Sequence, residues 1–151
     1  MTAAHKQPVS VLVVIHTAAL DVLLLERAAH PGFWQSVTGS REGNESLMET
    51  ARREVLEETG IRHTNGVLSD WQMTNTFEIF TEWRHRYAPG VSHNAEHVFS
   101  LQVADRQAVT ISPSEHRDWL WLPWQEAAER CFSWTNRDAI LLLAKRSVSA
   151  T

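Results

Sequence analysis

The sequence predicts an α/β fold in which helices pack on both faces of a mixed β-sheet. Short apolar runs rich in β-branched residues are interspersed along the chain with segments whose apolar residues recur at helical spacing. The chain has 151 residues, the length of one domain with a substantial core, and it contains no repeat, linker or low-complexity tract. We therefore expect a single domain over residues 1–151, with an ordered core from about residue 6 to about residue 147.

The first part of the chain is expected to hold three extended segments. Val9–Ile15 is a continuous apolar run with β-branched residues, which is typical of a buried strand. Val22–Arg27 has the same character, and the segment between these two runs is short enough for a hairpin-like connection. His30–Gly32 breaks the chain, and Phe33–Thr38 follows as a short extended stretch.

A helix is expected to begin near Leu47 and to stop at Gly60. Ser46 and Glu49 have the spacing of a capping box, in which the Ser46 hydroxyl accepts a hydrogen bond from the Glu49 backbone N–H. Glycine readily adopts the left-handed conformation that ends helices. Between these ends, an apolar residue at every fourth position forms a narrow stripe that should face the core.

The rest of the chain is expected to hold further strands and two helices. The predicted strands lie within Arg62–Ser69, which also has loop character, and at Thr74–Trp83, Phe99–Val103 and Trp119–Leu122. Loops are predicted at Arg84–Gly90 and Pro113–Asp118. One helix should follow Pro123 over residues 124–131, and the last should run from near Thr135, with Asp138 in the capping-box position, to about Ser147.

Composition excludes several classes of protein. The formal net charge of −4 and the pI near 6.0 argue against a nucleic-acid coat, which needs a basic field. The single cysteine, Cys131, excludes an internal disulfide framework and suits a reducing compartment. No apolar run has the length of a signal peptide core or a membrane span. We expect a cytoplasmic protein with neither nucleic-acid nor membrane partners, and the sequence carries no signal of oligomeric state.

The predicted helix after Ser46 carries three glutamates close together. Glu54, Glu57 and Glu58 fall on one side of the helix, beside its apolar stripe, so they border the core. Like charges at this spacing repel one another, so a cation should lie among them. Ligands that offer only oxygen suit Mg²⁺, or Mn²⁺ as a substitute, better than zinc. The alternative is a solvated acidic face on which Arg53 pairs with Glu49 or Glu57.

The longer stretch around these glutamates resembles a known family. Gly39, then Glu45 after five residues, then Arg53–Ile61 after seven more, match every defined position of G-x5-E-x7-R-E-U-x-E-E-x-G-U, where U is bulky and apolar. This is the signature of the Nudix hydrolase family, which hydrolyses a diphosphate linked to another moiety. The resemblance implies an α/β/α sandwich, which agrees with the fold class expected from the pattern of elements.

The resemblance also implies roles for individual residues. Glu54 and Glu58 would be the primary metal ligands, Glu57 a further ligand or the general base, and Arg53 the residue that orients the carboxylates. Gly39 would bring its carbonyl to the metal, an approach that the absent side chain allows.

A fourth carboxylate is expected from outside the signature. Family members often recruit one, and Glu115, in the polar loop before Trp119, is the best candidate. The alternative for a lone loop glutamate is simple solvation. The nearby His116, like His85, His93 and His97, has no convincing metal-ligand spacing, and we interpret these four as surface or core histidines.

The segments that flank the signature are more specific. Residues 8–15, 33–40, 77–80, 84–91 and 133–137 closely resemble the branch of the family that removes pyrophosphate from dihydroneopterin triphosphate in folate biosynthesis. By position, Lys6, Arg27 and Thr38 would then contact substrate, and Ser133 would line the pocket together with Phe77, Glu78, Ile79 and Phe80. Phe77 and Phe80 would sandwich a flat ring, and Glu78 would accept hydrogen bonds from its amino and imino groups.

The expected substrate is therefore a small-molecule triphosphate, cleaved with Mg²⁺. One alternative is a broader diphosphatase for dATP or oxidised purine nucleotides, in which Glu78 would contact a purine edge. Another is a non-catalytic module that senses a nucleotide-like ligand, and the intact signature argues against it.

Overall fold

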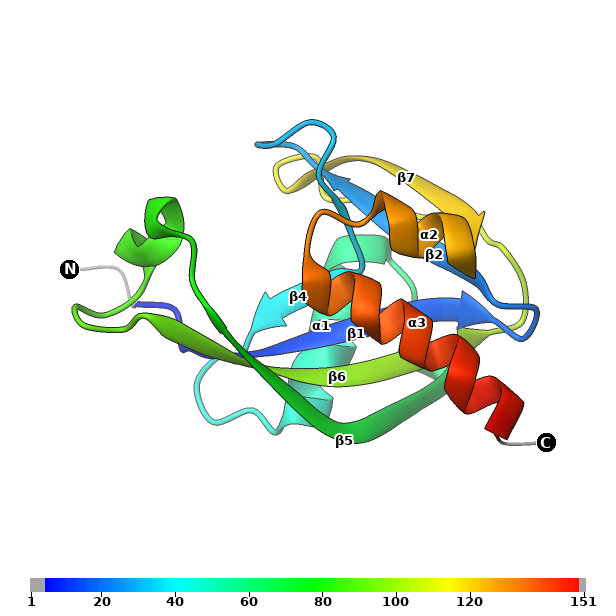
Figure 1. Cartoon of the computed structure of the whole chain (residues 1–151), viewed down its shortest axis with the longest axis horizontal. Coiled ribbons are helices and arrows are strands. Elements are labelled where there is room, and N and C mark those ends of the chain that lie inside the picture. The colour runs from blue at the N-terminus through cyan, green and yellow to red at the C-terminus, as the bar shows by residue number, and fades with distance from the viewer. Residues whose placement is uncertain (1–4, 150–151) are drawn as a thin grey trace.

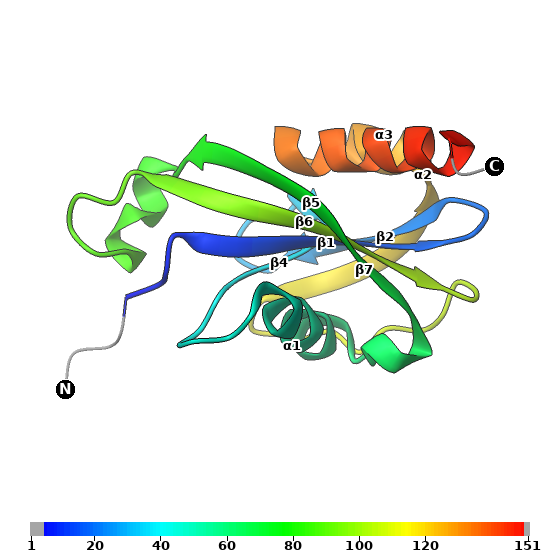
Figure 2. The same ribbon diagram turned by 90° about the horizontal axis from the view of Figure 1, so that it is seen from below.

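The computed structural model describes residues 5–149, apart from the side chains of residues 147–149. Within this range the chain forms a seven-stranded mixed sheet with helices on both faces (Figures 1 and 2). The strands are β1 (Val9–Thr17), β2 (Asp21–Arg27), β3 (Trp34–Gln35), β4 (Val37–Ser40), β5 (Gly66–Glu78), β6 (His93–Val103) and β7 (His116–Pro123). The α-helices are α1 (Leu47–Thr59), α2 (Trp124–Arg130) and α3 (Trp134–Ser149), and two 3-10 helices span His63–Asn65 and Thr81–Arg86. The predicted α/β architecture is confirmed.

Strand β1 is the centre of the sheet. It runs parallel to β6 and antiparallel to β2 and β4. Strand β4 pairs with the first half of β1, whereas β2 pairs with its end at His16. Strand β5 extends the sheet beyond β6, and β3 and β7 both pair with β2. Strands β4 and β2 therefore pair with different parts of β1, its first half and its end.

Each face of the sheet carries its own hydrophobic core. Helix α1 covers one face, and α2 and α3 cover the other, as Figure 2 shows. Val11 and Val13 of β1 pack on the α1 side with Val55, whereas Leu12 and Val14 pack on the α3 side. Strand β1 is buried on both faces, and this explains why its sequence is continuously apolar.

Helix α1 begins and ends as its sequence predicts. The Ser46 hydroxyl accepts a hydrogen bond from the Glu49 N–H at 3.1 Å. Gly60 closes the helix in the left-handed conformation, at a φ of 74°, and donates its N–H to the Leu56 carbonyl. The 13-residue helix therefore has fixed ends, which set the position of the glutamates along it.

Several strands differ from the prediction. Strand β5 is continuous from Gly66 to Glu78, with an irregularity between Asp70 and Thr74, and Thr81–Trp83 is a 3-10 turn and not part of a strand. Strand β6 begins at His93, six residues before the predicted Phe99–Val103 segment.

Strand β7 begins at His116, inside the segment predicted as a loop. The added residues pair with neighbouring strands, and this pairing satisfies the hydrogen bonds of their backbone N–H and C=O groups even where their side chains do not favour a strand.

No α-helix among the described residues is long and apolar enough to span a membrane.

Candidate active site

Arg53 joins helix α1 to the loop that precedes it. Its Nε and Nη2 atoms donate to the two carboxylate oxygens of Glu45 at 2.7 and 2.9 Å, and Nη2 also donates to the Ser40 carbonyl at 3.0 Å. Its Nη1 atom donates to Glu54 at 2.8 Å and to Glu57 at 3.2 Å. Arg53 holds the pKa of Glu45 at about 2, mainly through these hydrogen bonds. The guanidinium therefore fixes three of the signature glutamates, Glu45, Glu54 and Glu57, relative to strand β4.

Glu58 is the most buried of the signature glutamates. Its side chain is 2% exposed, and its Oε2 atom has no hydrogen-bond partner within residues 5–149. Burial raises the pKa of Glu58 well above its ordinary value, and the neighbouring Glu54 raises it further. Burial also raises the pKa of Glu54, which shares a hydrogen bond with Glu58. Two adjacent buried carboxylates cannot both be charged without a compensating cation, so this is not a solvated acidic face.

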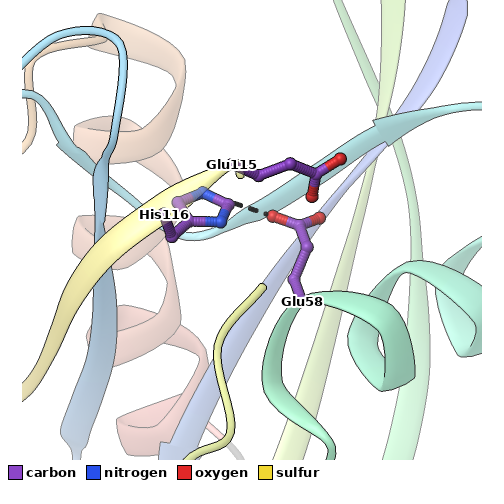
Figure 3. A group of neighbouring side chains, drawn as sticks. All are labelled: Glu58, Glu115 and His116. Atoms are coloured by element: carbon purple, nitrogen blue, oxygen red, sulfur yellow. Dashed lines mark ion pairs between the residues drawn. The ribbon is translucent and has the colours of Figure 1, made fainter. Parts of the chain in front are cut away.

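The start of strand β7 and the residue before it bring two more polar side chains to Glu58. Ligand atoms of Glu58, Glu115 and His116 all lie within 4.8 Å of one another, and the His116 Nε2 atom is 3.5 Å from Glu58 Oε1 (Figure 3). The structure thus places Glu115 beside Glu58, and its role as a further metal ligand stays a prediction. Burial, with Arg27 nearby, lowers the pKa of His116 to about 4, so the imidazole is neutral near pH 7.

His116 is 3% exposed, which agrees with its interpretation as a surface or core histidine, but it also lies against Glu58 in a group of possible metal ligands. The sequence offers one indication of this position, which is that His116 directly follows Glu115 at the start of β7. Strand β7 is irregular there, because its register against β2 shifts between Glu26 and Arg27. No local pattern indicates such an irregularity.

The donor set fits a hard divalent ion. Glu58 and Glu115 offer carboxylate oxygens beside the neutral His116 ring, with the Glu54 carboxyl next to Glu58, and the unpartnered Glu58 oxygen is buried where a cation would satisfy it. Glu57 lies at the rim, with its side chain 56% exposed and held by Arg53. Its position suits contact with solvent or substrate at the edge of the cluster.

Gly39 of β4 lies against the Glu54 carboxyl. A Cβ atom at this position would overlap the Glu54 carboxyl group, so any other residue would displace this carboxyl from its position. This contact gives a structural reason for the first glycine of the signature. The expected contact of the Gly39 carbonyl with a metal stays a prediction.

A cavity of about 810 Å³ begins at these glutamates. It is lined by all of the predicted substrate and metal residues, which are Lys6, Arg27, Thr38, Gly39, Glu54, Glu57, Glu58, Phe77, Glu78, Ile79, Phe80, Glu115 and Ser133. Arg53 lies behind them and contacts Glu54 and Glu57. The structure therefore brings the predicted residues together, and their contact with substrate stays a prediction.

Cations lie near the mouth of the cavity. The Lys6 backbone N–H donates to the Arg86 carbonyl, and its ammonium lies 5.8 Å from the centre of the Tyr87 ring. Desolvation, and then the Arg86 charge, lowers the pKa of Lys6, although the residue as a whole keeps exposed surface. The Arg27 guanidinium lies over the Trp83 ring at 4.8 Å. Arg86 and Trp83 were not predicted, because they come from the segment that we expected to be a strand end and a loop.

The predicted ring-binding segment occupies the end of β5 and the turn after it. Phe77 is half-buried, Ile79 is buried and Phe80 is exposed. The Glu78 side chain is 68% exposed and forms an ion pair with Arg84. Glu78 is thus a solvated, charge-paired residue in the protein without substrate.

The far end of the cavity holds buried polar side chains that sequence analysis did not single out. Ser10, Asn94, Glu96 and Asn136 line it from the α3 side of the sheet. The alternation of β6 could have indicated them. Asn94 and Glu96 lie on the same strand face as the core residue Val98, where apolar residues are usual, so polar residues there are unexpected.

The fold and the site define a class of protein. Residues 6–143 match the family model described as NUDIX domain. The chain belongs to the Nudix hydrolase family.

Particular members of this family are similar along nearly the whole chain. The dihydroneopterin triphosphate diphosphatase of Escherichia coli strain K12 is 45% identical over 139 residues, which cover 90% of this chain and 91% of the relative. The enzyme of the same name from Haemophilus influenzae is 40% identical over 139 residues, with 90% and 87% covered. The solved structure of the E. coli dihydroneopterin triphosphate pyrophosphohydrolase superposes with a TM-score of 0.85 at 44% identity, covering 91% of this chain and 95% of that chain.

Proposed function

We propose that this protein hydrolyses 7,8-dihydroneopterin 3′-triphosphate to dihydroneopterin monophosphate and pyrophosphate, as a step of folate biosynthesis in the cytoplasm. The observation that carries the proposal is the 45% identity over 91% of a relative that bears this activity in its name. One cavity is lined by the glutamate cluster, by Lys6 and Arg27, and by the aromatic residues Phe77 and Phe80. This lining agrees with a substrate that has a triphosphate and a flat ring.

The glutamate cluster is the proposed reaction centre. Glu54, Glu58 and Glu115 would hold Mg²⁺, for which Mn²⁺ would substitute. When bound, such ions neutralise charge on phosphate oxygens and lower the pKa of a water. His116 is neutral and packs against Glu58, so it limits the positions that this carboxylate can take.

The remaining residues bind the substrate and accept a proton. Lys6 and Arg27 would donate hydrogen bonds to the phosphate oxygens, so the triphosphate of the substrate would bind beside these two cations. The attacking water gives its oxygen to phosphorus as the phosphorus–oxygen bond that bridges the α- and β-phosphates breaks, which releases pyrophosphate from the monophosphate, and its proton passes to a carboxylate. Glu57 is the proposed acceptor, since Arg53 positions it at the exposed rim of the cluster. Glu57 as a further metal ligand is the alternative.

The test compares specificity constants for dihydroneopterin triphosphate, dATP, dGTP and 8-oxo-dGTP in Mg²⁺, measured by pyrophosphate release. A preference of about tenfold or more for the pterin, equivalent to about 1.4 kcal/mol in the transition state, is expected. Equal or faster turnover of a purine substrate would contradict the proposal and favour a broader nucleoside triphosphate diphosphatase.

A further inference from the structure

Four buried polar side chains form a corner of the cavity beneath helix α3. Ser10 of β1, Asn94 and Glu96 of β6 and Asn136 of α3 are all less than one-tenth exposed. They lie on the same sheet face as Leu12 and Val98, which belong to the core packed under α2 and α3. Polar groups at core positions need hydrogen-bond partners.

Two oxygen atoms in this corner lack partners. Glu96 is 4% exposed, and its Oε1 atom has no hydrogen bond in the part of the chain that the structure describes, although Thr135 bonds to the carboxyl. The Asn94 amide donates to the Ser10 hydroxyl at 2.7 Å, which leaves its Oδ1 atom unpaired. Both unpaired atoms are acceptors. The complementary partner is therefore a group rich in N–H donors.

Asn136 supplies a donor beside these acceptors. Its side-chain oxygen accepts a hydrogen bond from the Ser36 backbone N–H at 2.8 Å. Because a backbone N–H can only donate, this bond fixes the orientation of the amide. The amino end of the Asn136 side chain is then the end that can donate to a ligand.

We propose that Glu96, together with Asn94, accepts the N–H groups of the substrate ring and thereby determines which ring the enzyme takes. This inference rests on the proposed hydrolysis of a pterin triphosphate. The pyrimidinone edge of a pterin presents an amino group, a ring N–H and a carbonyl, and guanine presents the same order. A carboxylate accepts both N–H groups, and the Asn136 amide can donate to the carbonyl. The corresponding edge of adenine offers one amino donor and a ring nitrogen acceptor, which a carboxylate does not satisfy.

The position of the corner is compatible with the glutamate cluster. Glu96 and Glu58 line the same cavity, from opposite sides of the sheet. A ring held at Glu96 would therefore direct its triphosphate past Lys6 and Arg27 toward α1. Burial raises the pKa of Glu96 to about 7, which agrees with a carboxyl that lacks sufficient donors in the protein alone.

Glu78 is the competing candidate for the same role. It is exposed and already paired with Arg84, whereas Glu96 is buried and incompletely paired. Water competes for an exposed carboxylate, so its loss changes ring preference less than the loss of a buried one.

The test is Glu96→Gln, assayed well above pH 7 with the pterin triphosphate, dGTP and dATP. Glutamine keeps the shape but turns one acceptor into a donor, which opposes the ring amino group and suits adenine. We expect the kcat/KM ratio of pterin to dATP to fall about ten- to a hundredfold, with dGTP following the pterin. Glu129→Gln, a matched change on the exposed side of α2, should leave the ratio unchanged.

Three outcomes separate the possible failures. An unchanged ratio in Glu96→Gln with a melting temperature near that of the wild type would overturn the inference. A selective fall in Glu78→Gln, and not in Glu96→Gln, would overturn it in favour of Glu78. Wild-type protein with little activity on the pterin triphosphate would refute the proposed function instead. In that case, a fall in the kcat/KM ratio of dGTP to dATP in Glu96→Gln would still support Glu96 as the residue that selects the ring.

Discussion

At the scale of single residues, Glu58 combines deep burial with an unpaired oxygen. A buried carboxylate is retained at such a cost only where something cationic compensates it. Its nearest neighbours are another carboxyl, Glu54, and a neutral imidazole, His116, and neither supplies that charge. A divalent ion bound here, as proposed above, would supply the missing charge.

Glu58→Gln is expected to lower kcat about 10²- to 10³-fold in saturating Mg²⁺, because it removes charge from the metal site and leaves the packing intact. Without metal, its melting temperature should equal or exceed that of the wild type, since a neutral amide is easier to bury. Steady-state kinetics and thermal unfolding measure the two effects. Wild-type turnover in this variant would refute the metal assignment.

Glu96 makes stability depend on pH. Its folded pKa of about 7 lies above the ordinary value of 4.5, so between these values the unfolded chain releases a proton that the folded protein keeps. The contribution of Glu96 to stability is therefore fully present below about pH 4.5 and is lost as pH rises to about 7, by about 3 kcal/mol at about 1.4 kcal/mol per pKa unit.

The measurement is denaturant unfolding of metal-free wild type and Glu96→Gln across this pH range. The difference between their unfolding free energies should shift in favour of glutamine as pH rises. A difference that is independent of pH would show that the pKa of Glu96 is not raised.

At the scale of elements, helix α1 positions its carboxylates only with the help of the loop before it. The capped ends set the length of the helix, and Arg53 then ties Glu45 and Ser40 to Glu54. One planar guanidinium makes all of these bonds, and an ammonium group cannot reproduce its geometry.

Arg53→Lys is therefore expected to lower kcat/KM about 10- to 100-fold, the usual cost of losing a group that orients metal ligands. The loop at residues 41–46 should also become easier to cleave by proteases. The matched control is Arg52→Lys, which changes the exposed neighbour on the same helix and should behave as the wild type. If Arg53→Lys has normal kcat/KM, the guanidinium does not organise the site.

At the scale of the whole molecule, ion binding and folding are linked. The cluster gathers side chains from α1 and from the start of β7, which come together only in the folded protein. An ion that binds only this state stabilises it by about 2.7 kcal/mol at a concentration of 100 times its Kd. For a domain of this size, that corresponds to a rise in melting temperature of about 5–10 °C.

Thermal unfolding with increasing Mg²⁺ checks this expectation, with a chelator as the reference. Glu58→Gln should show a much smaller rise than the wild type. An equal rise in both proteins would place the stabilising ion elsewhere.

Much of the fold followed from local sequence. Ser46 and Gly60 define α1 through contacts within a few residues of each helix end, and the apolar run of β1 indicates burial on both faces whatever it packs against. The proximity of Glu54 and Glu58 was predictable in the same way, because they lie one helical turn apart. The boundaries of β6 and β7 were not, since pairing with distant strands extended them into polar segments.

The sequence by itself therefore determined the class of fold, the limits of α1 and the acidic chemistry of the site. Tertiary structure decided that His116 lies against Glu58 and that a polar corner closes the far end of the cavity. The physical reason is separation along the chain. Ser10 and Asn94 are 84 residues apart, and Ser36 and Asn136 are 100 apart. Whether such groups meet depends on strand order and register, which no local pattern contains.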